Sequence, residues 1–160
     1  MLKEKELTKL KVRTPLSERK YRVGNTWQRE GKHFGMMLTY IDARYVQDVL
    51  DRIVGSANWS SAFIEIKGRL FCKITVRYLD ENGDIAYVSK MDCGTESNVE
   101  KEKGEASDSF KRCAVHFGIG RDLYHVQQQH QRFYIVELKN GKPPFGWKPQ
   151  ILEENNNDDF

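Results

Sequence analysis

The clean alternation of apolar and polar side chains over residues 69–79 constrains the fold of this chain most. RLFCKITVRYL (69–79) places every second side chain on the same side of an extended strand. One of the two sets is apolar: Leu70, Cys72, Ile74, Val76 and Tyr78. Asn82-Gly83 favours a tight hairpin turn, after which IAYVSKM (85–91) returns antiparallel. With SAFIEIKG (61–68) before it, this segment predicts an antiparallel three-stranded meander.

Helical periodicity flanks the meander on both sides. YIDARYVQDVLDRIVG (40–55) has Asp42 as a candidate N-cap, an apolar stripe and Gly55 at its end. KGEASDSFKRCAVHFG (103–118) has a second stripe and ends at Gly118. Lys111 and Arg112 fall outside that stripe, so the spacing predicts that they lie away from the core. The apolar stripes are formed by Val46, Val49, Leu50 and Ile53, and by Ala106, Phe110, Cys113, Ala114 and Phe117.

The remaining segments complete a prediction of the α+β class. Residues 1–13 predict a short Lys-rich helix ended by Pro15, residues 16–37 a basic, irregular, glycine-containing arm, and residues 133–144 a further strand. Residues 92–104 predict a polar loop, and Leu123 and Tyr124 a short turn. The expected architecture is an antiparallel β-β-β-α core with an N-terminal helix and an additional C-terminal strand. We expect one domain over residues 1–149, with 1–20 as an N-terminal arm, and a disordered acidic tail over 150–160.

The charge distribution indicates a polyanionic partner. The net charge is +3, but the last eight residues hold four acids and no base, so the rest of the chain is +7 (26 cations against 23 − 4 = 19 anions). The arm interleaves Lys and Arg with aromatic residues, which suits a single nucleic acid strand, or equally an arm that packs its rings on the core. We expect no membrane span and no signal peptide, and a cytoplasmic location.

No catalytic constellation is apparent, so we expect a binding protein without cofactors rather than an enzyme. The chain lacks a nucleophile motif and a phosphate-cradling Gly-Lys loop. Its three cysteines are odd in number and show no C-x-x-C spacing. Cys113 and His116, one turn apart, are a weaker candidate for a shared metal than Cys113 is for a buried thiol. A metal-dependent nuclease centred on Asp92, Glu96, Glu100 and Lys101 stays a minority alternative.

Three motifs resemble the Rad52 superfamily of single-strand annealing proteins, and most of all its bacterial and phage branch of DdrA-like proteins and phage recombinases. They are YIDARYVQDVLDRIVGSANW (40–59), RLFCKITVRYLDENGDIAYV (69–88) and KGEASDSFKRCAVHFGIGRDLY (103–124). The resemblance implies a ring of many subunits that holds single-stranded DNA in a basic groove and anneals complementary strands without ATP, in recombination and double-strand break repair.

The resemblance also implies candidate DNA-binding residues. Lys111 and Arg112 match the cationic pair of the groove helix, Ser107 and Lys103 lie on its earlier turns, and Tyr40 matches an aromatic residue of the groove wall. Arg29 matches a basic residue of the preceding arm if one residue of insertion is allowed, and Lys32 extends the cations of that arm. Arg69 and Lys73 share a basic strand face with Arg77, and this face lines either the same groove or a second surface.

Two questions stay open from the sequence. A protein that only binds and protects single-stranded or 3′ ends needs the same groove as one that anneals. The acidic tail ending in Phe160 is a candidate docking segment for replication or repair proteins, against the simpler interpretation of a solvated end.

Overall fold

The computed structural model describes residues 1–94 and 101–150, with side chains from residue 104 onward in the second range. The chain divides into two compact units. Unit 1 consists of Met1–Thr14 and Ile41–Asp122, and unit 2 of Pro15–Tyr40 and Leu123–Phe160. Within the described ranges, no helix is long and apolar enough to cross a membrane. The predicted tail lies outside the described residues beyond Gln150.

Unit 1 contains the predicted antiparallel meander. Strands β3 (Trp59–Ile66), β4 (Arg69–Leu79) and β5 (Ile85–Cys93) pair in the order β3-β4-β5. Tight turns join them, and left-handed backbone occurs at Lys67, Gly68 and Gly83, as the Asn-Gly signal predicts for the second turn. Cys72, Ile74 and Val76 are completely buried, so the apolar set of the alternation faces the core. The predicted α+β class and the predicted meander are confirmed.

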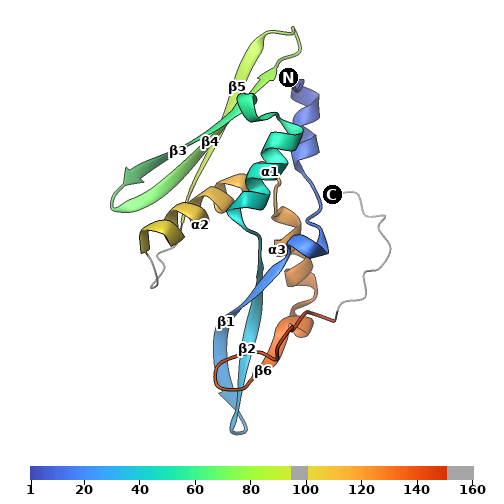
Figure 1. Ribbon diagram of the computed structural model, residues 1–160, viewed down its shortest axis with the longest axis vertical. Coiled ribbons are helices and arrows are strands. Elements are labelled where there is room, and N and C mark those ends of the chain that lie inside the picture. The colour runs from blue at the N-terminus through green and yellow to red at the C-terminus, as the bar shows by residue number, and fades with distance from the viewer. Residues whose placement is uncertain (95–100, 151–160) are drawn as a thin grey trace. The chain divides into compact units, whose positions relative to one another are not determined.

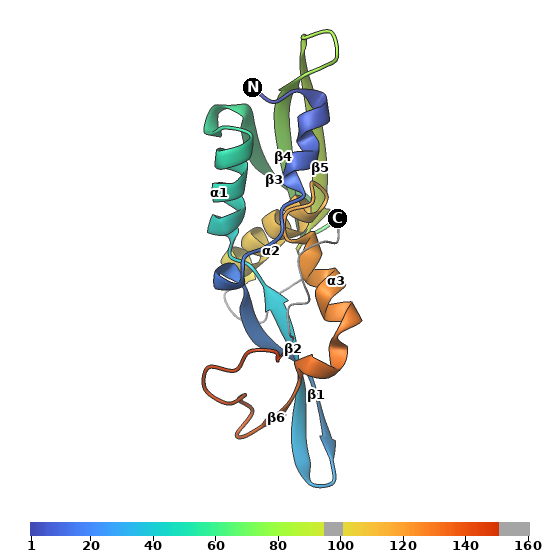
Figure 2. The same cartoon turned by 90° about the vertical axis from the view of Figure 1, so that its right-hand side faces the viewer.

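Two α-helices and two 3-10 helices, one N-terminal and one at Ser56–Asn58 (η3), belong to the described part of unit 1. α1 (Ala43–Ile53) buries Val46, Val49 and Leu50. α2 (Lys101–Val115) packs against β4 and β5 and buries Phe110, Cys113 and Ala114. Figure 1 shows α2 lying against this sheet. The predicted N-terminal helix is a 3-10 helix, η1 (Glu4–Leu10), and Figure 2 shows it beside α1. Its last residue, Leu10, is completely buried in the core of unit 1.

Unit 2 corrects the prediction of an irregular arm. Residues 20–40 form a hairpin of β1 (Lys20–Arg29) and β2 (Lys32–Tyr40), and β2 also pairs with β6 (Ile135–Leu138). The glycines that suggested a loop have places in this hairpin. Gly31 (φ 75°) is in the turn, and a Cβ on Gly35 would lie 3.0 Å from a side-chain carbon of Leu138.

Two shorter corrections concern the C-terminal half. The predicted turn at Leu123 and Tyr124 is part of a helix, α3 (Arg121–Gln129). The predicted strand over 133–144 is limited to the four residues of β6, preceded by a 3-10 helix, η4 (Gln131–Tyr134). β6 is short because it pairs only with residues 33–36 of β2, and the chain then turns at Asn140-Gly141.

Candidate nucleic-acid interface

Lys111 and Arg112 lie outside the buried apolar stripe of α2, and Arg112 lies close enough to the sheet to reach Asp92 of β5. The helix buries Phe110, Cys113 and Ala114 in the core, whereas the two cationic residues are only partly buried. Consecutive helical residues diverge by about 100° around the axis. The pair therefore presents its charges in two directions, which suits contacts with successive phosphates better than a joint contact with one.

Arg112 is held by an acidic residue of the sheet. Its Nε lies 3.8 Å from Oδ2 of Asp92 on β5, and Nε2 of His116 lies 3.1 Å from the same oxygen. Arg112 Nε is buried, although 42% of its side chain is exposed. Asp92 is itself fixed, because its Oδ1 accepts the backbone N–H of Cys93 at 2.7 Å. Asp92 therefore orients the guanidinium and offsets part of its charge.

Of the two candidates on the earlier turns of α2, the structure describes one completely. Ser107 is partly buried and lies one turn before Lys111 on the same side of the helix. The backbone of Lys103 belongs to α2, but its side chain is outside the described residues.

Arg69 and Lys73 lie on the opposite face of the β3-β4-β5 sheet. They alternate with Cys72 and Ile74, whose side chains face α2, so the structure does not bring them together with Lys111 and Arg112. Both are exposed, and Arg69 donates to the backbone carbonyl of Gly94 at 2.9 Å. Of the two predicted arrangements, a second surface fits this geometry.

The remaining candidates belong to unit 2. Arg29 and Lys32 are opposite each other at the end of the β1-β2 hairpin, and both are exposed. Lys32 Nζ forms an ion pair with Glu137 of β6 at 3.3 Å, and Arg29 Nε lies 3.8 Å from Glu30. Tyr40 is the last residue of β2 and is partly buried.

The geometry does not join Cys113 and His116 in a shared metal site. The Cys113 thiol is buried, donates to the carbonyl of Lys90 at 3.1 Å and is hydrogen-bonded to Cys72, whereas His116 is exposed beside Asp92. The hydrogen bond to Cys113 and burial raise the pKa of the Cys72 thiol. In the part of the chain that the structure describes, no three metal-ligating side chains form a group. Glu96, Glu100 and the side chain of Lys101 lie outside that part.

Sequence comparison relates the chain to known DNA-repair proteins. Residues 5–140 match the Rad52/22 family of double-strand break repair proteins. The single-stranded DNA-binding protein DdrA of Deinococcus deserti is 40% identical over 111 residues, which are 68% of this chain and 52% of the relative. The single-stranded DNA-binding protein DdrA of Deinococcus radiodurans is 35% identical over 96 residues, 59% of this chain and 43% of the relative. The chain spans about half the length of the curated relatives it matches.

Proposed function

Because the chain belongs to the Rad52/22 family of double-strand break repair proteins, we propose that it binds single-stranded DNA and anneals complementary strands without ATP. The observation that carries the proposal is the partly exposed Lys111–Arg112 pair, which lies outside the buried stripe of α2. Cations on phosphates bind any sequence and leave base edges free for pairing, as annealing requires. The proposed contacts on unit 1 are Lys103, Ser107, Lys111 and Arg112, with Arg69 and Lys73 on a second surface; those on unit 2 are Arg29, Lys32 and Tyr40.

The proposal includes assembly of many copies into a ring. β3 is an edge strand of its sheet among the described residues, and every residue from 60 to 66 on it is exposed. Three of these residues are large and apolar: Phe63, Ile64 and Ile66. An exposed, apolar edge strand favours pairing with another chain. This strand therefore supports self-association of unit 1.

A second candidate function is protection of single-stranded ends without annealing. The names of the two relatives state single-stranded DNA binding and do not state annealing. Protection would use the same cations, because it needs the phosphate contacts but not the release of paired strands.

An annealing assay separates the two candidates. Two complementary fluorescent oligonucleotides are mixed with the protein, without ATP or divalent metal, and the protein is sized alone and with DNA. We expect accelerated annealing by a large assembly. Tight binding without acceleration would favour end protection, and DNA degradation that requires a divalent metal would favour the nuclease. The absence of both binding and assembly would contradict the proposed function.

We predict that Asp92→Asn strengthens single-stranded DNA binding about two- to fivefold, the range expected on release of a partly exposed ion pair. Asparagine keeps the shape of the side chain and the acceptor for the Cys93 N–H, but removes the charge that offsets Arg112. Fluorescence anisotropy with labelled oligo-dT measures the change. Asp48→Asn, at an exposed position of α1, is the matched control. An affinity equal to that of the control would contradict the role of Asp92.

A further inference from the structure

The two faces of the unit 2 sheet differ: one contributes to a hydrophobic core, and the other carries the four Lys and Arg residues of β1 and β2. The register pairs Val23 with Met37 and Thr26 with Gly35, and β6 adds Val136 and Leu138 on the same side. Met37, Val136 and Leu138 are buried there, with Val23 packed against them. The other face carries the side chains that alternate with this set. We call it the outer face and define it by Lys20, Arg22, Trp27, Arg29, Lys32 and Phe34.

A β-bulge collects these residues on one face. Three residue steps on β1, from Val23 to Thr26, are opposite two steps on β2, so β1 contains one extra residue. Without it, Arg22 and Trp27 would point to opposite sides, because their separation is odd. The bulge lies at Gly24, where a Cβ would come within 2.8 Å of the Leu38 side chain. The glycine therefore permits the bulge, and the bulge brings the cations of both halves of β1 together.

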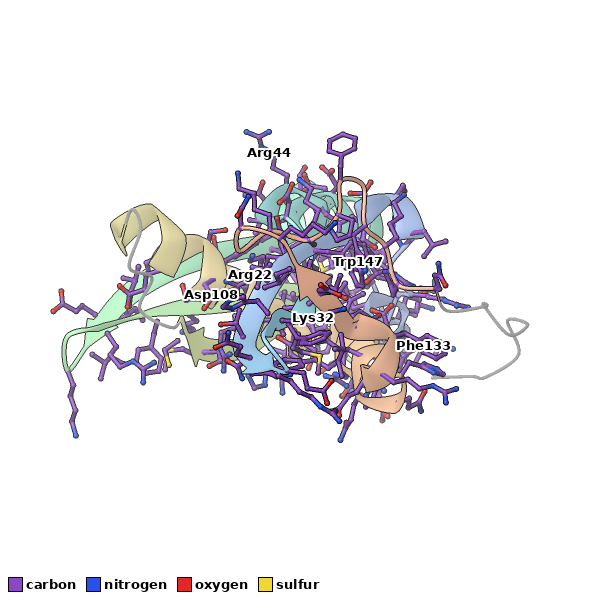
Figure 3. The ribbon with its side chains drawn as sticks, turned by 90° about the horizontal axis from the view of Figure 1, so that it is seen from below. Arg22, Lys32, Arg44, Asp108, Phe133 and Trp147 are labelled. Atoms are coloured by element: carbon purple, nitrogen blue, oxygen red, sulfur yellow. The ribbon has the colours of Figure 1, made fainter. Side chains whose placement is uncertain are left out.

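The outer face combines positive charge with exposed aromatic surface. Its four cations are exposed, and Glu137 is the acidic residue that β6 adds to this face. The rings of Trp27 and Phe34 stack with an interplanar angle of 18° and centroids 6.2 Å apart, and Trp27 is 38% exposed. Figure 3 shows Arg22 and Lys32 on this hairpin, seen from below. The ion pairs of Arg29 and Lys32 are exposed and hence weak, so they do not prevent contact with phosphates.

We propose that the outer face is a further contact surface for single-stranded DNA, in which the Trp27–Phe34 pair stacks on a base and the surrounding cations contact phosphates. The inference rests on the proposed function and deepens it. Stacking suits an annealing protein because a stacked base keeps its pairing edge accessible. A merely solvated sheet face would account for the charges but not for the exposed tryptophan beside them. β1 is about 30 Å long at ~3.3 Å per residue, which is enough for several nucleotides.

The test uses Trp27→Leu, which keeps an apolar side chain and removes the aromatic face. We expect affinity for oligo-dT to fall roughly tenfold, the loss of about one stacked base, with an unchanged dependence on salt. Trp27→Phe is expected to restore most of the affinity. Arg22→Ala is expected to reduce the salt dependence instead, because it removes a phosphate contact. Phe145→Ala, at a fully exposed aromatic residue of the same unit, is the matched control.

An oligonucleotide with abasic sites makes the test specific for stacking. Trp27→Leu is expected to cost affinity on oligo-dT but not on the abasic strand. An equal loss on both strands, or a loss no larger than that of Phe145→Ala, would overturn the inference. A change in assembly size without a change in DNA affinity would also overturn it, in favour of contact between copies. If the unaltered protein binds no single-stranded DNA, the proposed function fails. If the unaltered protein binds it and Trp27→Leu binds it equally well, this inference alone fails.

Discussion

The double variant Lys111→Ala/Arg112→Ala is expected to bind single-stranded DNA roughly 10- to 100-fold more weakly than the unaltered protein. Since about 1.4 kcal/mol corresponds to a tenfold change, this range assigns about 0.7–1.4 kcal/mol to each of two partly exposed contacts. The two side chains diverge enough to contact different phosphates. The slope of log affinity against log salt is expected to become shallower by about 1.4, since each lost contact on a single strand removes ~0.7. Titrations of labelled oligo-dT at four or more salt concentrations measure both quantities.

A control variant that loses the same amount of charge distinguishes binding at the α2 pair from attraction by the net positive charge of the protein. Arg44 and Arg52 on α1 are both exposed, so Arg44→Ala/Arg52→Ala also removes two positive charges from unit 1. We expect this variant to lose much less affinity and to keep its assembly size and helix content. Equal losses in the two double variants would mean that net charge, rather than the position of the α2 pair, determines binding. Unchanged affinity after loss of Lys111 and Arg112 would remove the main support for the proposed function.

The elements that could be predicted from sequence are those specified by local rules. Alternation with an Asn-Gly turn defined β4 and β5, and the 3.6-residue period defined α1 and the part of α2 that carries Lys111 and Arg112. Most positions of the predicted stripes are buried, but Ile53 and Ala106 are only partly buried. Tyr45 of α1 and Ser109 of α2 are buried although the predicted stripes did not include them. In these elements, the local preference of the chain and its tertiary packing agree.

The hairpin of unit 2 could not be predicted in this way, because its bulge shifts the alternation of β1 by one residue. A period-2 pattern that changes phase looks irregular, and Gly24, Gly31 and Gly35 strengthened that impression. A search that allows one phase shift at a glycine would have placed Arg22, Trp27 and Arg29 on the same face. The ion pair between Arg112 and Asp92 was also not predicted from the sequence, because the two residues are 20 positions apart and meet only through the packing of α2 on β5.

A buried pair of side chains fastens the N-terminal segment to the rest of unit 1. Asp122 accepts the backbone N–H of Thr14 through Oδ2 and its hydroxyl through Oδ1, each at 2.8 Å. Thr14 is completely buried and Asp122 is 6% exposed. The two residues are the last of the two segments of unit 1, so the pair ties together two points at which the chain leaves the unit.

Asp122→Ala is therefore expected to lower the free energy of unfolding by about 3 kcal/mol. The substitution leaves the buried N–H and hydroxyl of Thr14 without this acceptor, and such groups cost far more than a lost surface contact. The midpoint of thermal unfolding is expected to fall by roughly 6–12 °C for a chain of this length. Circular dichroism with heat and with urea measures both values, and Asp48→Ala on α1 is the control, expected to stay within about 0.5 kcal/mol. A loss as small as that of the control would mean that Leu10 and the rest of the core, rather than this pair, hold the N-terminal segment in place.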